Sequence, residues 1–245
     1  MFKVARLLGV CVWVVLGFFV AQVIVVFVVD ALVGIGWISK GELTTPLAEL
    51  LLLAIGYLLA LALIIVLPRL ITGKQFIKGL TEQLGITKSP RPLSILWSIL
   101  GYGVYTVLTI LFSVIVQSVW HGFNSSQAQS VGFQGLSGSA QYIMAFVALV
   151  VIPPLVEEML FRGYLFGRLR KNLGFWLSMF ITSALFGFVH LQWNVGIDVF
   201  ALSLVLCFLR EKTGTIWAGV GLHMIKNGVA YTVLFLQPDI LKHFL

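Results

Sequence analysis

Long, uninterrupted apolar runs dominate the chain. Residues 7–29 contain no charged side chain and follow Lys3 and Arg6. A helix needs roughly 20 apolar residues to cross the hydrocarbon core of a bilayer, so this run predicts a first membrane-spanning helix. A cleaved signal peptide would have an apolar core of about 7–15 residues and a small-residue cleavage site. Neither is found here, so we expect the helix to be retained.

Further apolar segments predict further spans. Because the apolar residues are continuous and do not alternate with polar ones, they favour helices over a transmembrane barrel. We therefore predict an all-α polytopic membrane helix bundle of about seven spans, forming a single membrane domain over residues 1–245. The spans after the first are expected at about 47–67, 94–118, 142–171, 174–190, 197–209 and 215–236.

The segment 69–92 does not read as a span. It mixes apolar residues such as Leu70 and Leu84 with Lys74, Lys78 and Lys88. This pattern predicts an amphipathic helix lying in the membrane interface, and a solvated basic loop is the alternative.

Composition narrows the class of protein. Hydrophobic residues make up 60% of the chain and charged residues 10%, and the mean hydropathy is +1.05. Soluble domains carry about 25% charged residues, so the composition excludes a soluble globule, a disordered tail, a collagen and a disulfide scaffold. Cys11 and Cys207 both lie inside apolar runs, and we interpret them as small buried hydrophobic residues, not as a disulfide or metal pair.

The positive charges are distributed unevenly, which predicts an orientation. Cytoplasmic loops of membrane proteins collect Lys and Arg, and the loop 119–141 has neither. We therefore expect an integral protein of the cell membrane with a cytoplasmic N-terminus and an external C-terminus, with Lys40 and Lys242 outside and Lys226 within the last span. The net charge of +7 then requires no nucleic-acid partner. The residues expected at the cytoplasmic side are 13 of the 16 cations, namely Lys3, Arg6, Arg69, Lys74, Lys78, Lys88, Arg91, Arg162, Arg168, Arg170, Lys171, Arg210 and Lys212.

A few polar residues fall within the predicted spans. Ionisable groups in a bilayer cost several kcal/mol each, so those present usually carry a function or are paired. Here they are Glu49, Glu157, Glu158, Arg162, His190, Asp198, His223 and Lys226, with Asn227 as a neutral member.

Helix arithmetic predicts that four of these residues converge. Pro153 and Pro154 bend the fourth helix but need not end it. Glu157 then lies about 15 residues before the turn at 172–174 and His190 about 17 after it, and both depths come to roughly 22–26 Å at 1.5 Å per residue. By the same arithmetic, His223 lies roughly 15 Å from its own turn, and Asn227 lies one helical turn deeper on the same face.

Such a group of side chains suits hydrolysis of an amide. A glutamate in a semi-dry cavity is a good general base, so Glu157 with His190 would hold and deprotonate a water. His223 and Asn227 would donate hydrogen bonds to the oxyanion on the attacked carbonyl. Glu157, His190 and His223 as Zn²⁺ ligands are the alternative, since two histidines and one carboxylate form a known catalytic set. The sequence has no HExxH motif, the common zinc-protease signature.

Other interpretations of these residues stay open. Glu158 and Arg162 are spaced to form an intrahelical ion pair, and His223 with Asn227 could be a helix-packing hydrogen-bond pair. In a small transporter or a non-catalytic membrane scaffold, the remaining polar residues Asp198, Lys226 and Glu49 would form an ion path. The GxSG sequence at 135–138 indicates a rhomboid-type serine protease with Ser137 as nucleophile, but this serine is predicted to lie in an external loop.

Three motifs resemble those of a known family, the CAAX-protease and bacteriocin-processing (CPBP, or Abi) family, which includes the type II CAAX prenyl endopeptidases. The resemblance covers about residues 140–235, the expected catalytic core, and nothing in 1–139 carries it. The motifs are Glu157-Glu158-x-x-x-Arg162, Phe186-x-x-x-His190 and His223-x-x-x-Asn227.

The resemblance implies an intramembrane endopeptidase acting on a peptide or lipidated protein. It implies that Glu157 activates a water with help from His190, that His223 and Asn227 stabilise the oxyanion, and that Glu158 and Arg162 support them. On this mechanism no cofactor is required, with zinc as the alternative. Gly163 and Gly167 form a GxxxG pair that would serve close packing within one chain or between two chains.

Overall fold

The computed structural model describes residues 2–73, 79–124, 127 and 131–237, and within these residues it contains helices and no strands. Lys74, Lys78 and Lys242 fall outside the described residues. The helices, with π-helical stretches marked η, are α1 (Phe2–Gly34), α2 (Lys40–Leu43), α3 (Pro46–Leu61), η1 (Ala62–Val66), α4 (Leu67–Ile71), α5 (Leu80–Leu84), α6 (Pro92–Val119), α7 (Ser139–Phe146), η2 (Val147–Val151), α8 (Ile152–Glu157), η3 (Glu158–Phe166), α9 (Gly167–Arg170), α10 (Phe175–Phe188), α11 (Trp193–Thr213), α12 (Trp217–Tyr231) and η4 (Thr232–Leu236).

The predicted all-α polytopic bundle is confirmed. Among the described residues, five continuous helices are long and apolar enough to cross a membrane: Val4–Gly34, Pro46–Ile71, Pro92–Val119, Ser139–Arg170 and Trp193–Thr213. Helix α10 has only 14 residues, fewer than the roughly 20 that a perpendicular span needs. The number of seven spans therefore stays a prediction.

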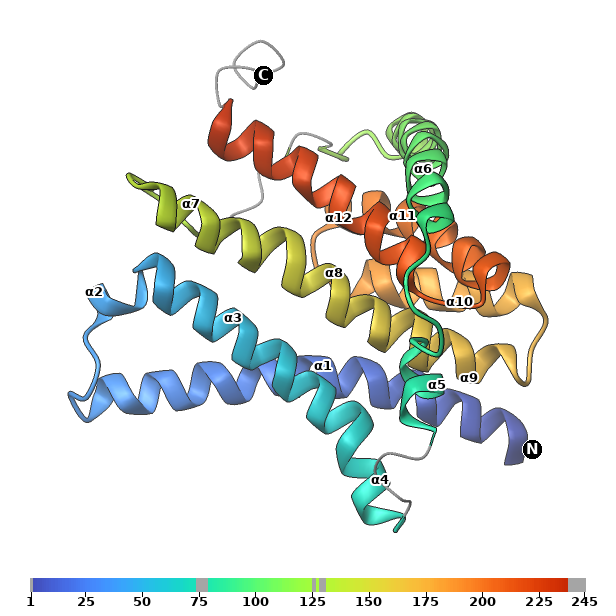
Figure 1. Cartoon of the computed structure of the whole chain (residues 1–245), viewed down its shortest axis with the longest axis horizontal. Helices are drawn as coiled ribbons and strands as arrows, with labels where there is room; N and C mark the ends of the chain where they lie inside the picture. The colour runs from blue at the N-terminus through green and yellow to red at the C-terminus, as the bar shows by residue number, and fades with distance from the viewer. Residues whose placement is uncertain (1, 74–78, 125–126, 128–130, 238–245) are drawn as a thin grey trace.

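The helices form two groups around a central one. In the first group, α1 and α3 cross each other along one side of the molecule (Figure 1). In the second group, α6, α11 and α12 pack together through a core that includes Leu202, Leu206 and Leu222. The continuous helix Ser139–Arg170 runs between the two groups (Figure 1), and its residues 160–166 are all buried. This central position brings its polar residues into contact with both groups.

The central helix runs through its prolines as predicted, but it contains two π-helical stretches that the sequence analysis did not predict. The first stretch, η2, directly precedes Pro153 and Pro154. Proline has no N–H, so carbonyls one turn earlier lose their donor, and the backbone hydrogen bonds shift register. The second stretch, η3, begins at Glu158. Single π turns inside α-helices often occur at functional sites.

The long interfacial helix predicted over 69–92 is not formed in the described residues. Helix α4 ends at Ile71, and the next helix is the five-residue α5, which packs against η3. Gly163 permits this contact, because an added Cβ would overlap the carbonyl oxygen of Leu84. Gly163 therefore serves close packing within the chain, whereas a Cβ at Gly167 would meet nothing within 4 Å.

Candidate active site

Glu157 ends α8, and its side chain is enclosed by residues from distant parts of the chain. The residue is 5% exposed. Its Oε1 accepts a hydrogen bond of 2.5 Å from the Tyr57 hydroxyl on α3, and its Oε2 lies 3.8 Å from Nε2 of His223 on α12. Three helices therefore meet at this one carboxylate, and among the described residues Oε2 has only the longer contact.

The neighbouring glutamate forms a fully buried ion pair. Arg162 Nη1 donates to Glu158 Oε1 at 2.7 Å, and both side chains are fully buried. The Arg162 guanidinium also lies 4.3 Å from the centre of the Phe186 ring. The same Glu158 oxygen is 3.4 Å from Nδ1 of His223. The predicted intrahelical pair is thus formed, and it also holds one face of the His223 ring.

His190 lies in the turn just after α10, two residues past the helix end at Phe188. Its Nδ1 is 2.8 Å from the carbonyl oxygen of Phe186. Because a carbonyl only accepts, Nδ1 must carry a proton, and Nε2 of the neutral ring is left as an acceptor. The Phe186 ring packs edge-on against both imidazoles, with centroids 5.0 Å from His190 and 6.0 Å from His223.

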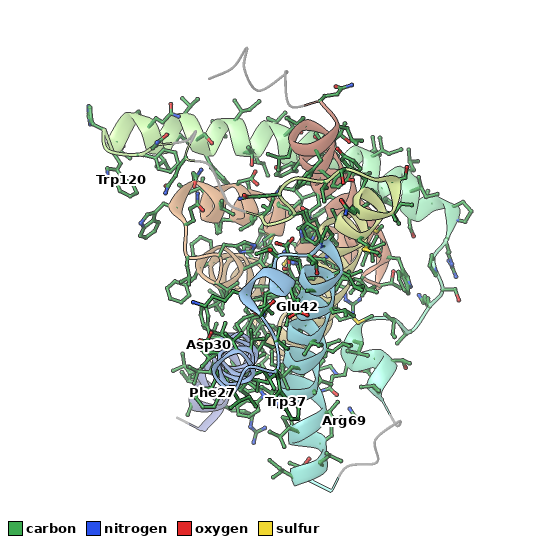
Figure 2. All side chains as sticks on the ribbon, turned by 90° about the vertical axis from the view of Figure 1, so that its left-hand side faces the viewer. Phe27, Asp30, Trp37, Glu42, Arg69 and Trp120 are labelled. Atoms are coloured by element: carbon green, nitrogen blue, oxygen red, sulfur yellow. The ribbon has the colours of Figure 1, made fainter. Side chains whose placement is uncertain are left out.

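Glu157 and His190 line the same cavity, which we call the α1–α3 cavity. Its volume is about 630 Å³, and most of its wall comes from α1 and α3. Gln22 and Asp30 of α1 are polar members of that wall. Asp30 lies near Phe27, close to the C-terminal end of α1, and away from Arg69 (Figure 2). The rest of the lining is mainly apolar: Phe18, Val25, Val26, Val29, Leu52, Leu53 and Val189, with Tyr57.

Asn227 is placed one turn beyond His223, but it does not line this cavity. Its Nδ2 donates to the carbonyl oxygen of Leu149 at 2.9 Å. That carbonyl would receive its hydrogen bond from Pro153 in an α-helix or from Pro154 in a π-helix, and proline can donate none. Asn227 therefore supplies a donor that the prolines remove. A side-chain amide carries two N–H groups, so one remains after this contact.

The alternative zinc ligands do not converge as a metal site does. Within the described residues, no three His, Cys, Asp or Glu side chains are arranged to hold one metal ion. Glu157 Oε2 and His223 Nε2 lie 3.8 Å apart. The Nδ1 of His190 contacts a backbone carbonyl, an arrangement that zinc-bound histidines also adopt. The zinc alternative stays a prediction from the sequence.

The residues of the rival interpretations lie elsewhere. Ser137 is exposed, and its backbone N–H donates to the side chain of Gln141 at 2.9 Å. Asp198 accepts hydrogen bonds from Tyr105 and Thr109 and lies 3.3 Å from the Lys226 ammonium.

Glu49 lies apart from the Asp198 group, at the start of α3. It accepts from the backbone N–H of Phe133 at 2.5 Å. Phe133 is buried and has a φ of 59°, a left-handed conformation that is strained for a residue other than glycine. The carboxylate thus holds this turn, and the contacts of Glu49 and of Asp198 tie together separate parts of the bundle.

Sequence reasoning missed Tyr57. Its only signal was a phenol within the apolar span 47–67, and tyrosine at such a position is usually part of the core. Because Tyr57 is 100 residues from Glu157 in the chain, no local spacing pattern connects the two. The contribution of α1 and α3 to the site is visible only in the three-dimensional structure.

Comparisons with known proteins agree with these motifs. Residues 139–229, which contain Glu157, His190, His223 and Asn227, match the family model described as type II CAAX prenyl endopeptidase Rce1-like. The putative membrane peptidase YdiL of Bacillus subtilis (strain 168) is 24% identical over 193 residues, 78% of this chain and 73% of that protein. The membrane-embedded CAAX protease MroQ of Staphylococcus aureus (strain USA300) is 24% identical over 162 residues, 63% of this chain and 64% of that protein. No solved structure matches the chain.

The family model and the names of these relatives support a membrane protease. They agree with the resemblance carried by the three sequence motifs. Over residues 139–229 the chain is thus similar to the type II CAAX prenyl endopeptidases, and the comparisons support a protein of the CAAX-protease and bacteriocin-processing family.

Proposed function

We propose that the protein is an intramembrane endopeptidase that hydrolyses a peptide bond with a water activated by Glu157. The observation that carries this proposal is the shared cavity: Glu157 and His190 line one largely apolar chamber of about 630 Å³ between α1 and α3. A carboxylate and an imidazole acceptor in such a chamber can orient and deprotonate a water.

The contacts of Glu157 suit the role of base. Tyr57 fixes the position of Oε1, and Oε2 is free of short hydrogen bonds to the described residues. A water bound between Oε2 and Nε2 of His190 would give one proton to the carboxylate as its oxygen attacks the carbonyl carbon. When the carbon–nitrogen bond breaks, the same proton passes from Glu157 to the leaving amine, and a carboxylic acid remains on the other product.

The donors for the oxyanion follow from the contacts of His223 and Asn227. With its proton on Nδ1 towards Glu158, a neutral His223 presents an unprotonated Nε2. That ring therefore donates to an oxyanion only after gaining a second proton. The Asn227 amide keeps one N–H beyond its bond to Leu149. Because Asn227 lies outside the lining of the α1–α3 cavity, its role as an oxyanion donor rests on the family resemblance alone.

The substrate class and the cellular location are also part of the proposal, and they are based on the relatives. One relative is named as a membrane peptidase and another as a CAAX protease, so the proposed substrate is a membrane-anchored peptide or lipidated protein. The proposed location is the cell membrane with the N-terminus in the cytoplasm. Labelling of single cysteines placed at Lys40 and Lys212 in intact cells tests that orientation, because only Lys40 is expected outside.

The decisive experiment is cleavage by the purified, reconstituted full-length protein. A panel of membrane-anchored peptides is incubated with wild type and with Glu157→Gln, His190→Ala and Ser137→Ala variants. We expect the first two to lose about 10²–10⁴-fold in rate, the typical contribution of general acid–base catalysis. Ser137→Ala should cleave like wild type, since that side chain lies outside the cavity.

Three results of this experiment would count against the proposal. If wild type cuts no peptide, a non-catalytic scaffold or small transporter is favoured. If Glu157→Gln cuts as fast as wild type, Glu157 is not the base that activates the water. If only Ser137→Ala is inactive, the serine-protease interpretation replaces it. Metal analysis and a chelator on the same sample test the zinc alternative.

A further inference from the structure

A second and larger cavity lies at the other end of α1, the end that carries the N-terminus. We call it the basic cavity. Its volume is about 850 Å³, and its walls come from α1, from α4 and α5, from the end of the central helix and from the end of α11. Six cationic side chains line it: Arg6, Arg69, Arg168, Arg170, Lys171 and Arg210.

Both carboxylates in this lining already pair with cations of the same lining. Glu211 accepts from Arg170 at 2.9 Å, and Glu82 accepts from Lys171 at 2.9 Å. The Lys171 ammonium lowers the pKa of the Glu82 carboxyl below its usual value, so this pair stays ionised at neutral pH. Six cations against two carboxylates give the described lining a net charge of +4. The excess positive charge is therefore carried by arginines.

Two of these arginines are partly buried with incomplete hydrogen bonding. The Nε atoms of Arg168 and Arg210 are buried and have no hydrogen-bond partner among the described residues. The Arg168 guanidinium stacks 4.3 Å from the centre of the Tyr164 ring, which fixes its plane and leaves its N–H edge for another group. Removing these cations partly from water is unfavourable, and a bound anion would relieve that cost.

We infer that the basic cavity binds a phosphate group, held by the guanidinium groups of Arg168 and Arg210 with the other arginines around it. Planar guanidinium forks match phosphate oxygens in pairs, and basic cavities between membrane helices hold lipid head groups. A volume of about 850 Å³ exceeds what one phosphate ion fills. Apolar wall residues such as Leu7, Val10 and Phe166 would contact the less polar remainder of a phosphate ester.

The test is a thermal-shift and binding measurement on the full-length protein in a neutral detergent, and it does not depend on peptide cleavage. The probes are phosphatidylglycerol, phosphatidylcholine, inorganic phosphate and pyrophosphate. Phosphatidylglycerol should raise the unfolding temperature and phosphatidylcholine should not. Arg168→Gln/Arg210→Gln should weaken phosphatidylglycerol binding by about tenfold or more, since each removes charge-assisted hydrogen bonds.

The matched control removes two positive charges from outside the cavity. Lys88→Gln/Arg91→Gln changes a neighbouring cavity that does not share those residues, and it should bind like wild type. If Arg168→Gln/Arg210→Gln fails to fold, Arg168→Lys/Arg210→Lys keeps the charge and loses the fork, and it should bind with intermediate affinity.

The outcomes separate the sources of the phosphate. A shift with phosphatidylglycerol alone indicates a lipid head group, whereas an equal shift with inorganic phosphate or pyrophosphate indicates a soluble phosphate. In both cases the loss must be confined to the cavity variant. No shift with any phosphate, or equal losses in the cavity and control variants, overturns the inference.

Discussion

Replacing Arg162 by methionine should destabilise the protein severely. Arg162 and Glu158 are both fully buried and 2.7 Å apart. Without the guanidinium, the Glu158 carboxylate keeps only the 3.4 Å contact with His223 as an ionisable partner. Breaking a buried pair from one side costs about 3–5 kcal/mol. At about 2–4 °C per kcal/mol for a chain of this size, the unfolding temperature should fall by roughly 6–20 °C.

The assay is thermal unfolding of the purified protein in detergent, read as a double-mutant cycle with Glu158→Leu and Glu158→Leu/Arg162→Met. Removing both charges leaves no uncompensated buried ion, so the double variant should be more stable than Arg162→Met alone. Arg170→Met is the control, because Arg170 and Glu211 are 41% and 38% exposed and such a pair contributes about 1 kcal/mol or less. Additive losses in the double variant would refute the reasoning.

Three further variants test other contacts. Tyr57→Phe removes the hydroxyl that orients the candidate base, so kcat should fall about tenfold or more with little change in KM; an unchanged kcat refutes that role. Gly163→Ala should destabilise the chain by about 1–3 kcal/mol in thermal unfolding because the methyl group overlaps the backbone of α5, whereas Gly167→Ala has open space; equal effects would contradict the packing. Asn227→Leu leaves the Leu149 carbonyl without its side-chain donor and should lower the free energy of unfolding by about 1–3 kcal/mol in the same thermal assay. An unchanged unfolding temperature would show that this hydrogen bond does not stabilise the protein.

The sequence predicted those features that depend on one helix at a time. Apolar run length located the long spans, and the rise per residue brought Glu157 and His190 to one depth, where both line the α1–α3 cavity. The i,i+4 spacing predicted the pair of Glu158 and Arg162. These quantities are set by helix geometry, which is the same in every helix.

Features that depend on contacts between helices were not predictable. The Tyr57 hydroxyl reaches Glu157 only because α3 crosses the central helix, and no periodicity encodes that crossing. Pro153 and Pro154 indicate missing backbone donors already in the sequence, but the sequence analysis did not predict the π-helical bonding of η2 that accompanies them. Over its described residues, the segment 69–92 contains the end of α4 and the five-residue α5, and Gly163 leaves room for α5 to pack closely on η3.

The walls of the α1–α3 cavity come from two parts of the chain, of which the family model matches only one. The family model matches residues 139–229, which supply Glu157 and His190, yet most of the surface that a guest molecule would touch belongs to α1 and α3. On the proposed function, chemistry and selectivity are thus encoded separately. A substrate inferred from residues 139–229 alone would ignore the helices that form most of the cavity wall. Exchanging the first three helices between relatives is therefore the direct way to change substrate selectivity.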